Sequence, residues 1–157
     1  MLKQVIRANR SERGSSLLEA LVAIVLFSIG LLGLIGLQAV SIKSTSDAKY
    51  RADAALLANQ IIGQMWVDRA NIDSYAHFSG GAACNFSNAA SGLTTVTNWV
   101  AEINRVLPRA SLGNAQIAQI ALTTPIANTR QVTVTVCWQS PQENTPHNFV
   151  TTAHINL

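Results

Sequence analysis

The sequence predicts an α+β protein in which one long N-terminal helix is followed by a small antiparallel sheet. Three observations favour this class: an apolar run over 20–42, apolar residues at helical spacing over 54–66, and strand-like alternation over 115–157. The chain has 157 residues, 48% of them hydrophobic, which is enough for one modest domain. We therefore expect a membrane-spanning half of the helix, an amphipathic half, and a sheet packed on the amphipathic half.

The first element is a segment without charged residues from Ala20 to Ile42. As a helix it would measure about 34 Å at 1.5 Å per residue, which exceeds the roughly 30 Å hydrocarbon core of a bilayer. Basic residues before a span tend to stay on the cytoplasmic side, and here they are Lys3, Arg7, Arg10 and Arg13. The predicted topology is a single pass with the N-terminus inside and the C-terminus outside.

The same basic residues account for the net charge of the protein. Residues 1–14 carry the whole formal charge of +3, and the remaining chain has as many acidic as basic residues. A nucleic-acid surface needs Lys and Arg clustered on the folded part of the chain. Binding to nucleic acid is therefore not expected.

The apolar run, with Glu19 near its start, has two ordinary interpretations, a secretory signal peptide and a plain signal anchor. A secretory signal peptide has an apolar region of about 7 to 15 residues and a small-x-small cleavage site. Here the run is longer, and Leu37 stands where a small residue is needed two positions before Ala39. A plain signal anchor fits the length but leaves Glu19 unexplained, because an acidic side chain costs about 2.5 to 3.5 kcal/mol at the centre of a membrane helix.

The basic leader that ends in Gly14, followed by an apolar helix whose fifth residue is Glu19, resembles the class III signal of type IV prepilins and type II secretion pseudopilins. The resemblance implies that a prepilin peptidase cuts between Gly14 and Ser15 and methylates the new amine of Ser15. It also implies that Glu19 meets the N-terminal amine of a neighbouring subunit during assembly. Ser15 differs from the usual Phe, and Gly36 stands where many major pilins carry Pro.

Beyond the membrane segment the helical pattern continues on one face. Its apolar positions follow spacings of three and four residues, and they are Ala54, Leu57, Ala58, Ile61, Ile62, Met65 and Trp66. We expect this face, including the pair Met65 and Trp66, to pack in the core.

The remaining chain is expected to form a loop, a short helix and three strands. The stretch 77–98 is rich in Gly, Ser, Asn and Thr and indicates a long loop, after which Asn98 should cap a helix that Pro108 ends. Strand candidates lie at 115–124, 130–139 and 148–157, the last two joined as a hairpin. The expected buried faces are Trp99, Ile103, Val106 and Leu107 on the helix, Val132, Val134, Val136 and Trp138 on the second strand, and Phe149, Ala153, Ile155 and Leu157 on the third.

This order of elements extends the resemblance to a type IV pilin-like fold: a cleaved leader 1–14, a transmembrane and assembly helix 15–42, and an extracytoplasmic head 43–157. The segments IGLLGLIGLQ, LLANQIIGQMW and VTVTVCWQ, with the W-x-x-x-I-x-x-x-LP helix, resemble PilV-type minor pilins. That implies a subunit of the priming or tip complex of a type IV pilus, in the inner membrane before assembly and on the cell surface afterwards, with a part in adhesion or twitching motility.

The partners implied by this resemblance are the prepilin peptidase, other minor pilins and the major pilin. Two alternatives stay open. One is a minor pseudopilin of type II secretion, and the other is a DNA-uptake minor pilin, for which the balanced charge after the leader offers no phosphate-binding stripe.

Cys84 and Cys137 are the only cysteines, and both fall on the side that the resemblance places outside the cytoplasm. Because that side is oxidising, a disulfide between them is the expected state. The alternative is a metal site with His77, His147 or His154, although no Cys-x-x-Cys or His-x-x-x-His spacing is present. The histidines are otherwise expected on the surface of the loop and strands.

Catalysis finds little support in the sequence. There is no Gly-x-Ser-x-Gly motif and no phosphate-binding glycine loop, and the carboxylates Asp73, Glu102 and Glu143 stand in unrelated local contexts. We expect no enzyme, no cofactor, no metal and no small-molecule substrate.

Overall fold

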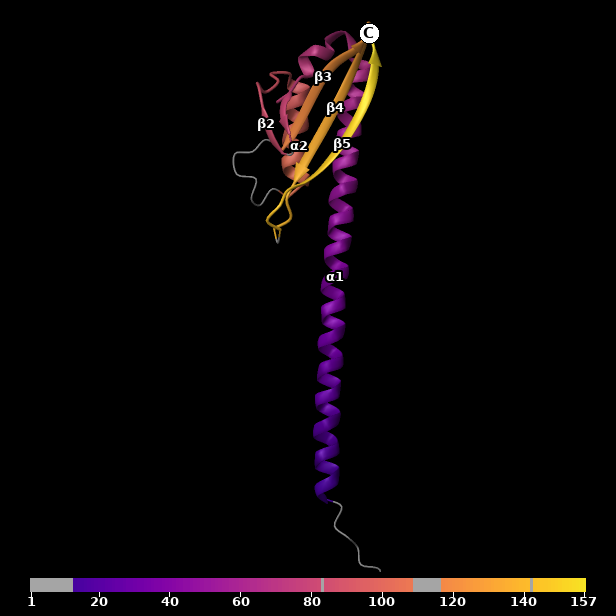
Figure 1. Cartoon of the computed structure of the whole chain (residues 1–157), viewed down its shortest axis with the longest axis vertical. Coiled ribbons are helices and arrows are strands. Elements are labelled where there is room, and N and C mark those ends of the chain that lie inside the picture. The colour runs from indigo at the N-terminus through magenta and orange to yellow at the C-terminus, as the bar shows by residue number, and fades with distance from the viewer. Residues whose placement is uncertain (1–12, 83, 109–116, 142) are drawn as a thin grey trace, which may run out of the picture. The chain divides into compact units, whose positions relative to one another are not determined.

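The computed structural model describes residues 13–82, 84–108, 117–141 and 143–157, and the elements are labelled in Figure 1. The predicted leader 1–14 lies outside the described residues except for its last two positions. Two compact units are present, one ending at Ser44 and the other comprising Thr45–Leu157.

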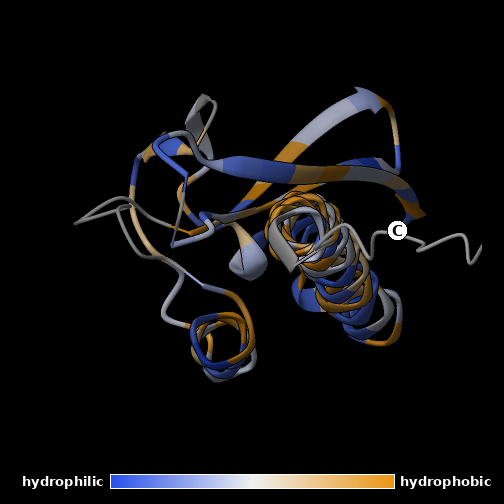
Figure 2. Ribbon diagram, turned by 90° about the horizontal axis from the view of Figure 1, so that it is seen from below, coloured by the Kyte–Doolittle hydropathy of each residue, from blue (hydrophilic) through white to orange (hydrophobic). Residues whose placement is uncertain are grey.

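Helix α1 runs from Arg13 to Val67 without interruption, so the predicted helix over 15–42 and its continuation over 54–66 are confirmed. In the first unit the large apolar side chains of α1 are exposed, for example Leu26 at 65% and Leu32 at 69%. When α1 is seen end-on, orange apolar residues recur around it (Figure 2). Of the described helices, α1 is the one that is long and apolar enough to cross a membrane, judged by length and composition.

In the second unit α1 contributes one stripe to the hydrophobic core. Six of the seven predicted positions are buried, namely Ala54, Leu57, Ala58, Ile61, Ile62 and Met65. The prediction that Trp66 packs in the core is wrong, because Trp66 is 45% exposed. At 100° per residue Trp66 lies about 120° around the helix from Ala54, and this places it beyond the buried stripe.

A three-stranded antiparallel sheet packs over this stripe. Its strands are β3 (Ala118–Ile126), β4 (Thr129–Trp138) and β5 (His147–Asn156), in the order β3-β4-β5. The three predicted strands are therefore confirmed. Positions 115–116 of the first predicted strand lie outside the described residues, and β3 ends two residues later than predicted. The α+β fold class is also confirmed, because a long N-terminal helix precedes a small antiparallel sheet in a pilin-like architecture.

The register of the sheet places alternate residues in the core. Ile120 faces Val134 across the β3–β4 pair, and Val132 faces Ala153 across the β4–β5 pair. The predicted face of β4 is buried along its whole length, from Val132 to Trp138. On β5 only part of the prediction holds, because Leu157 follows the end of the strand and is 52% exposed.

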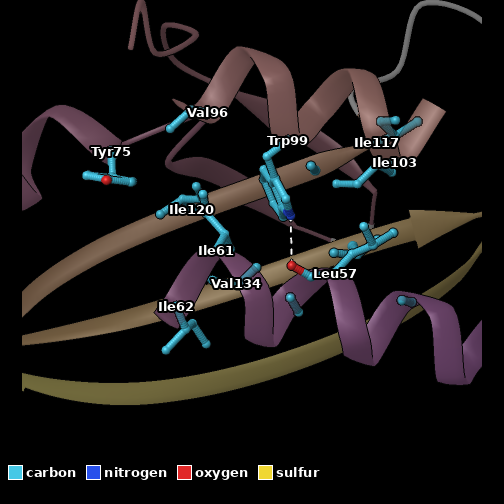
Figure 3. Packing of buried hydrophobic residues seen from close by; sticks show 14 of the residues in the cluster. Leu57, Ile61, Ile62, Tyr75, Val96, Trp99, Ile103, Ile117, Ile120 and Val134 are labelled. Atoms are coloured by element: carbon cyan, nitrogen blue, oxygen red, sulfur yellow. Dashed lines mark hydrogen bonds between the residues drawn. The ribbon is translucent and has the colours of Figure 1, made fainter. Parts of the chain in front are cut away.

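Helix α2 (Thr94–Val106) covers another part of the core. Trp99 and Ile103 are buried on its inner face, and Figure 3 shows Trp99 pointing toward α1 while Ile120 and Val134 approach from the sheet. The indole N–H of Trp99 donates to the carbonyl of Leu57 at 2.8 Å. This hydrogen bond joins α2 to α1.

The predicted loop 77–98 is wrong in two respects. It contains a short hairpin, β1 (Gly80–Ala82) with β2 (Asn85–Ser87), and α2 begins at Thr94, before the predicted cap Asn98. The helix starts early because Val96, three residues before Trp99, is fully buried on the same face. Burial in the core therefore overrides the weak helix preference of the threonines around it. A 3₁₀ helix, η1 (Arg69–Tyr75), links α1 to this region.

Candidate functional site

The residues of the predicted processing site lie in the first turns of α1. Gly14 and Ser15 belong to the first helical turn, and Glu19 follows Ser15 by four residues, which is about 6 Å along the axis. Ser15 and Glu19 are exposed. The bond between Gly14 and Ser15 thus lies where the backbone N–H groups of a helix have no intrahelical acceptor, which is the turn that unwinds most easily.

Glu19 is surrounded by exposed apolar side chains. Leu17, Leu18 and Val22 are 66%, 65% and 49% exposed. Within the part of the chain that the structure describes, no residue forms a hydrogen bond or ion pair with Glu19. The carboxylate is therefore open to a cation from outside the described chain.

A covalent link in the second unit joins Cys84 to Cys137, as expected for these two cysteines. Their Cα atoms lie 5.9 Å apart, and both residues are buried. Cys84 sits in the turn between β1 and β2 and Cys137 near the end of β4, so the bond fastens the small hairpin to the central strand. Since both sulfurs are bonded, neither can serve as a thiolate ligand, and the alternative metal site loses its cysteines.

The histidines occupy three different environments. His77 is 5% exposed, which corrects the expectation that it lies on the surface. His147 stacks on Trp138 with ring centroids 5.8 Å apart and pairs with Glu143, whereas His154 is exposed on β5. Among the described residues no group of three His, Cys, Asp or Glu side chains could hold a metal ion.

The three carboxylates considered for catalysis in the sequence, Asp73, Glu102 and Glu143, are each paired with a different cationic or basic group. Arg130 binds Asp73 with two hydrogen bonds of 2.8 and 3.1 Å and lowers the pKa of that carboxyl group. Glu102 accepts a hydrogen bond of 2.9 Å from Arg105 one helical turn later, which lowers the pKa of Glu102. The third carboxylate, Glu143, pairs with a histidine as described above. The three carboxylates thus have three different partners.

No pattern in the sequence indicates that His77 is buried, because it stands in a stretch rich in Gly, Ser and Asn. Its burial depends on an isolated bridge to Ile120 of β3, more than forty positions along the chain. Gln119 is buried beside it and donates from its side-chain amide to the carbonyls of Phe78 and Gly80, both at 2.9 Å. No local pattern in the sequence could have found these contacts.

The comparison with known families agrees with the N-terminal site. Residues 9–35 match the model of the prokaryotic N-terminal methylation motif, a range that contains Gly14, Ser15 and Glu19. No curated protein and no solved structure matches the chain. The matched motif is prepilin-type and supports a type IV pilin-like or pseudopilin protein that is processed by a prepilin peptidase and assembles with other pilins. The motif and the apolar helix are consistent with membrane anchoring.

Proposed function

We propose that this chain, which carries a prepilin-type methylation motif, is a minor pilin of a type IV pilus and is of the PilV type. In this proposal it acts in the priming or tip complex for pilus assembly, with an associated role in adhesion or motility. The observation that carries it is Glu19, an exposed carboxylate within the matched motif and among exposed apolar side chains.

The proposed maturation begins at the cytoplasmic face of the inner membrane. The leader and its basic residues stay inside, and the peptidase cuts between Gly14 and Ser15 and methylates the amine of Ser15. Glycine before the cut lets the enzyme approach the backbone closely, since no Cβ stands in the way. The new N-terminus then lies one helical turn from Glu19.

Glu19 supplies the proposed contact for assembly. An acidic side chain in an apolar helix is costly in lipid, and an opposite charge offsets that cost. The N-terminal amine of a neighbouring subunit offers this charge as the helix leaves the bilayer. Such a pair specifies the register of packed helices even where its net stabilisation is small.

The partners in this proposal are other minor pilins and the major pilin, and the final location is the pilus on the cell surface. The disulfide in the second unit suits an oxidising compartment. A minor pseudopilin of type II secretion is the second candidate, because the matched motif fits that class equally well. DNA uptake remains without a specific supporting observation.

Glu19→Gln tests the assembly contact because it keeps the size of the side chain and removes its charge. The ratio of processed protein in sheared pili to that in the inner membrane should fall, while cleavage after Gly14 continues. Asp53→Asn is the matched control, since it removes another carboxylate from the same helix, at a half-buried position outside the matched motif. An unchanged ratio for Glu19→Gln would refute the proposed contact.

Gly14→Val tests processing, because it should leave the leader attached and keep the protein in the membrane. Gly30→Ala is its control, since a Cβ at Gly30 meets no atom within 4 Å. Recovery of the wild-type protein in sheared pili would favour the pilus, and loss of protein secretion without loss of pili in a deletion strain would favour the pseudopilin. Normal filament entry of uncleaved Gly14→Val protein would contradict the class III interpretation.

A further inference from the structure

Two stretches of the second unit that are separated by the β1–β2 hairpin meet at the edge of β3. They are 74–78 and 89–93, and together with Ile120 we call them the His77 junction. The amide of Phe78 donates to the carbonyl of Ala89 at 2.9 Å, and the hydroxyl of Ser91 donates to the carbonyl of Ser74 at 2.7 Å. These bonds bring both ends of the hairpin region together.

His77 lies at the centre of this junction. Its backbone N–H donates to Ile120 at 3.1 Å and its carbonyl accepts from the Ile120 amide at 2.8 Å, so it extends the edge of β3. Its ring nitrogen Nδ1 accepts a hydrogen bond from the backbone N–H of Ser91 at 3.1 Å, and the ring contacts Phe78 edge-on with centroids 4.4 Å apart. One buried imidazole thus links both stretches to the sheet.

This geometry requires the neutral imidazole. Nδ1 can accept from Ser91 only while it carries no proton, and proton uptake would set two N–H donors against each other. A charged ring would also be buried away from water, and burial lowers the pKa of His77. Both effects oppose protonation in the closed junction.

The elements packed around His77 offer no compensating negative charge. Neither β3, the residues of the β1–β2 hairpin that form its strands, nor the stretch 88–93 contains an ionisable side chain. On η1, Tyr75 has a raised pKa and donates to Asp68 at 3.2 Å, while Asp73 is paired with Arg130. The two acidic groups of this region, Asp68 and Asp73, therefore already have partners, and the one basic side chain of η1, Arg69, is exposed.

We propose that His77 makes the His77 junction a pH-sensitive contact, in which proton uptake separates the stretch 89–93 from 74–78 and both from the edge of β3. The disulfide between Cys84 and Cys137 keeps the hairpin on β4, so the opening is local. Opening would uncover the side chain of Gln119, which the junction now buries. This inference concerns the second unit alone and does not rest on the proposed function.

The direction of the pH dependence follows from the two protonation states. Above the ordinary histidine pKa of about 6.5 the ring is neutral in both the closed and the open junction, and the equilibrium does not change with pH. Below about 6.5 the open junction takes up a proton more readily than the closed one. The open fraction then rises by up to about tenfold per pH unit, until the pH reaches the lower pKa of the closed state.

Amide hydrogen exchange of the full chain in detergent micelles tests this between pH 7.5 and 5.0, with rates divided by the intrinsic exchange rate at each pH. Protection of the amides of Phe78, Ser91 and Leu93 should fall about fivefold between pH 6.5 and 5.5. The amide of Cys137, which donates to Ile117 at 2.8 Å in the sheet, should keep its protection.

His77→Asn is the decisive variant, because its Oδ1 is attached to Cγ as Nδ1 is and can accept the same hydrogen bond without titrating. Its junction should show pH-independent protection, whereas the exposed control His154→Asn should behave like the wild type. Wild-type protection that is constant down to pH 5.0, or a His77→Asn protein as pH-sensitive as the wild type, would overturn the proposal. If His77→Asn does not fold, the ring titration of His77 followed by NMR in the wild type decides, and a pKa at or above 6.5 would overturn it as well.

Discussion

Trp99 and Trp138 are both buried, but their indole N–H groups are in opposite situations. Trp99 is 4% exposed and donates to the carbonyl of Leu57 at 2.8 Å. Trp138 is 2% exposed, and no acceptor for its Nε1 is present in the described part of the chain. Replacement of each by Phe removes the same N–H group and a similar apolar area. The two variants therefore differ mainly in that Trp99→Phe loses a hydrogen bond and Trp138→Phe does not.

The difference in unfolding free energy can be estimated from this contrast. Trp99→Phe loses a buried hydrogen bond with a net worth of about 1 kcal/mol. Trp138→Phe removes a buried donor without a partner, whose desolvation costs about 1–3 kcal/mol in the wild type, and Phe keeps an aromatic face against His147. The Trp99→Phe protein should therefore be less stable than the Trp138→Phe protein by about 2–4 kcal/mol.

Thermal unfolding of the full chain in detergent, followed by near-ultraviolet circular dichroism, measures this difference. For a unit of roughly 100 residues, about 4 °C of Tm corresponds to 1 kcal/mol, so the two Tm values should differ by about 8–16 °C. Trp66→Phe is the control, because Trp66 is 45% exposed and its replacement should change Tm little. Equal Tm values for the Trp99 and Trp138 variants would refute the reasoning, since the hydrogen bond would then have no measurable weight.

Three further predictions concern the second unit. Replacement of both Cys84 and Cys137 by Ser should lower the unfolding free energy by about 4 kcal/mol in the chain-entropy model for a separation of 53 residues, measured by thermal unfolding, and reductant should then have no further effect on the variant. Gly81→Ala should lower the unfolding free energy by about 1–2 kcal/mol, because φ is +79° and a Cβ would clash with the backbone oxygen of Asn85. Gly92→Ala, with open space around it, should lower it less in the same assay. Because the pKa of Asp73 is lowered in the folded state, its pair with Arg130 contributes stability above the ordinary pKa of Asp, and this contribution is lost as the pH falls through the folded-state pKa. The side chain of Asp73 is 71% exposed, so Asp73→Asn should change the unfolding free energy measured across this acid range by no more than about 0.5 kcal/mol.

The regular elements could be predicted from the sequence because their periodicity is local. The spacing of three and four residues from Ala54 to Met65 defines the buried stripe of α1, and the alternation from Val132 to Trp138 defines the buried face of β4. The exposed Trp66 shows the limit of this approach, because the stripe drifts around the helix and its edge is set by the width of the sheet that covers it. The N-terminal site was equally local, since Gly14 and Glu19 fall within one short motif.

The parts that could not be predicted depend on contacts between distant residues. His77 is buried because it pairs with Ile120, and α2 begins at Thr94 because Val96 reaches the core. Neither contact leaves a pattern in its own neighbourhood. The orphan N–H of Trp138 is likewise a property of the packed interior, since the strand pattern indicates that Trp138 is buried but not what lies opposite its nitrogen.

The order of the core elements along the chain has a consequence for how the protein reaches its native state. The buried stripe of α1 is synthesised first, yet its partners on β4 and β5, such as Val134 and Ile155, are synthesised last. The strands β3, β4 and β5 are consecutive neighbours and can pair with each other as a local meander. The apolar residues of the helix remain uncovered until this sheet has formed. Cys84 also remains a free thiol until Cys137 has been synthesised. A folding intermediate that exposes both an apolar helix face and a free thiol is prone to aggregation. Residues 54–65 are therefore the part of the core that stays uncovered longest during synthesis.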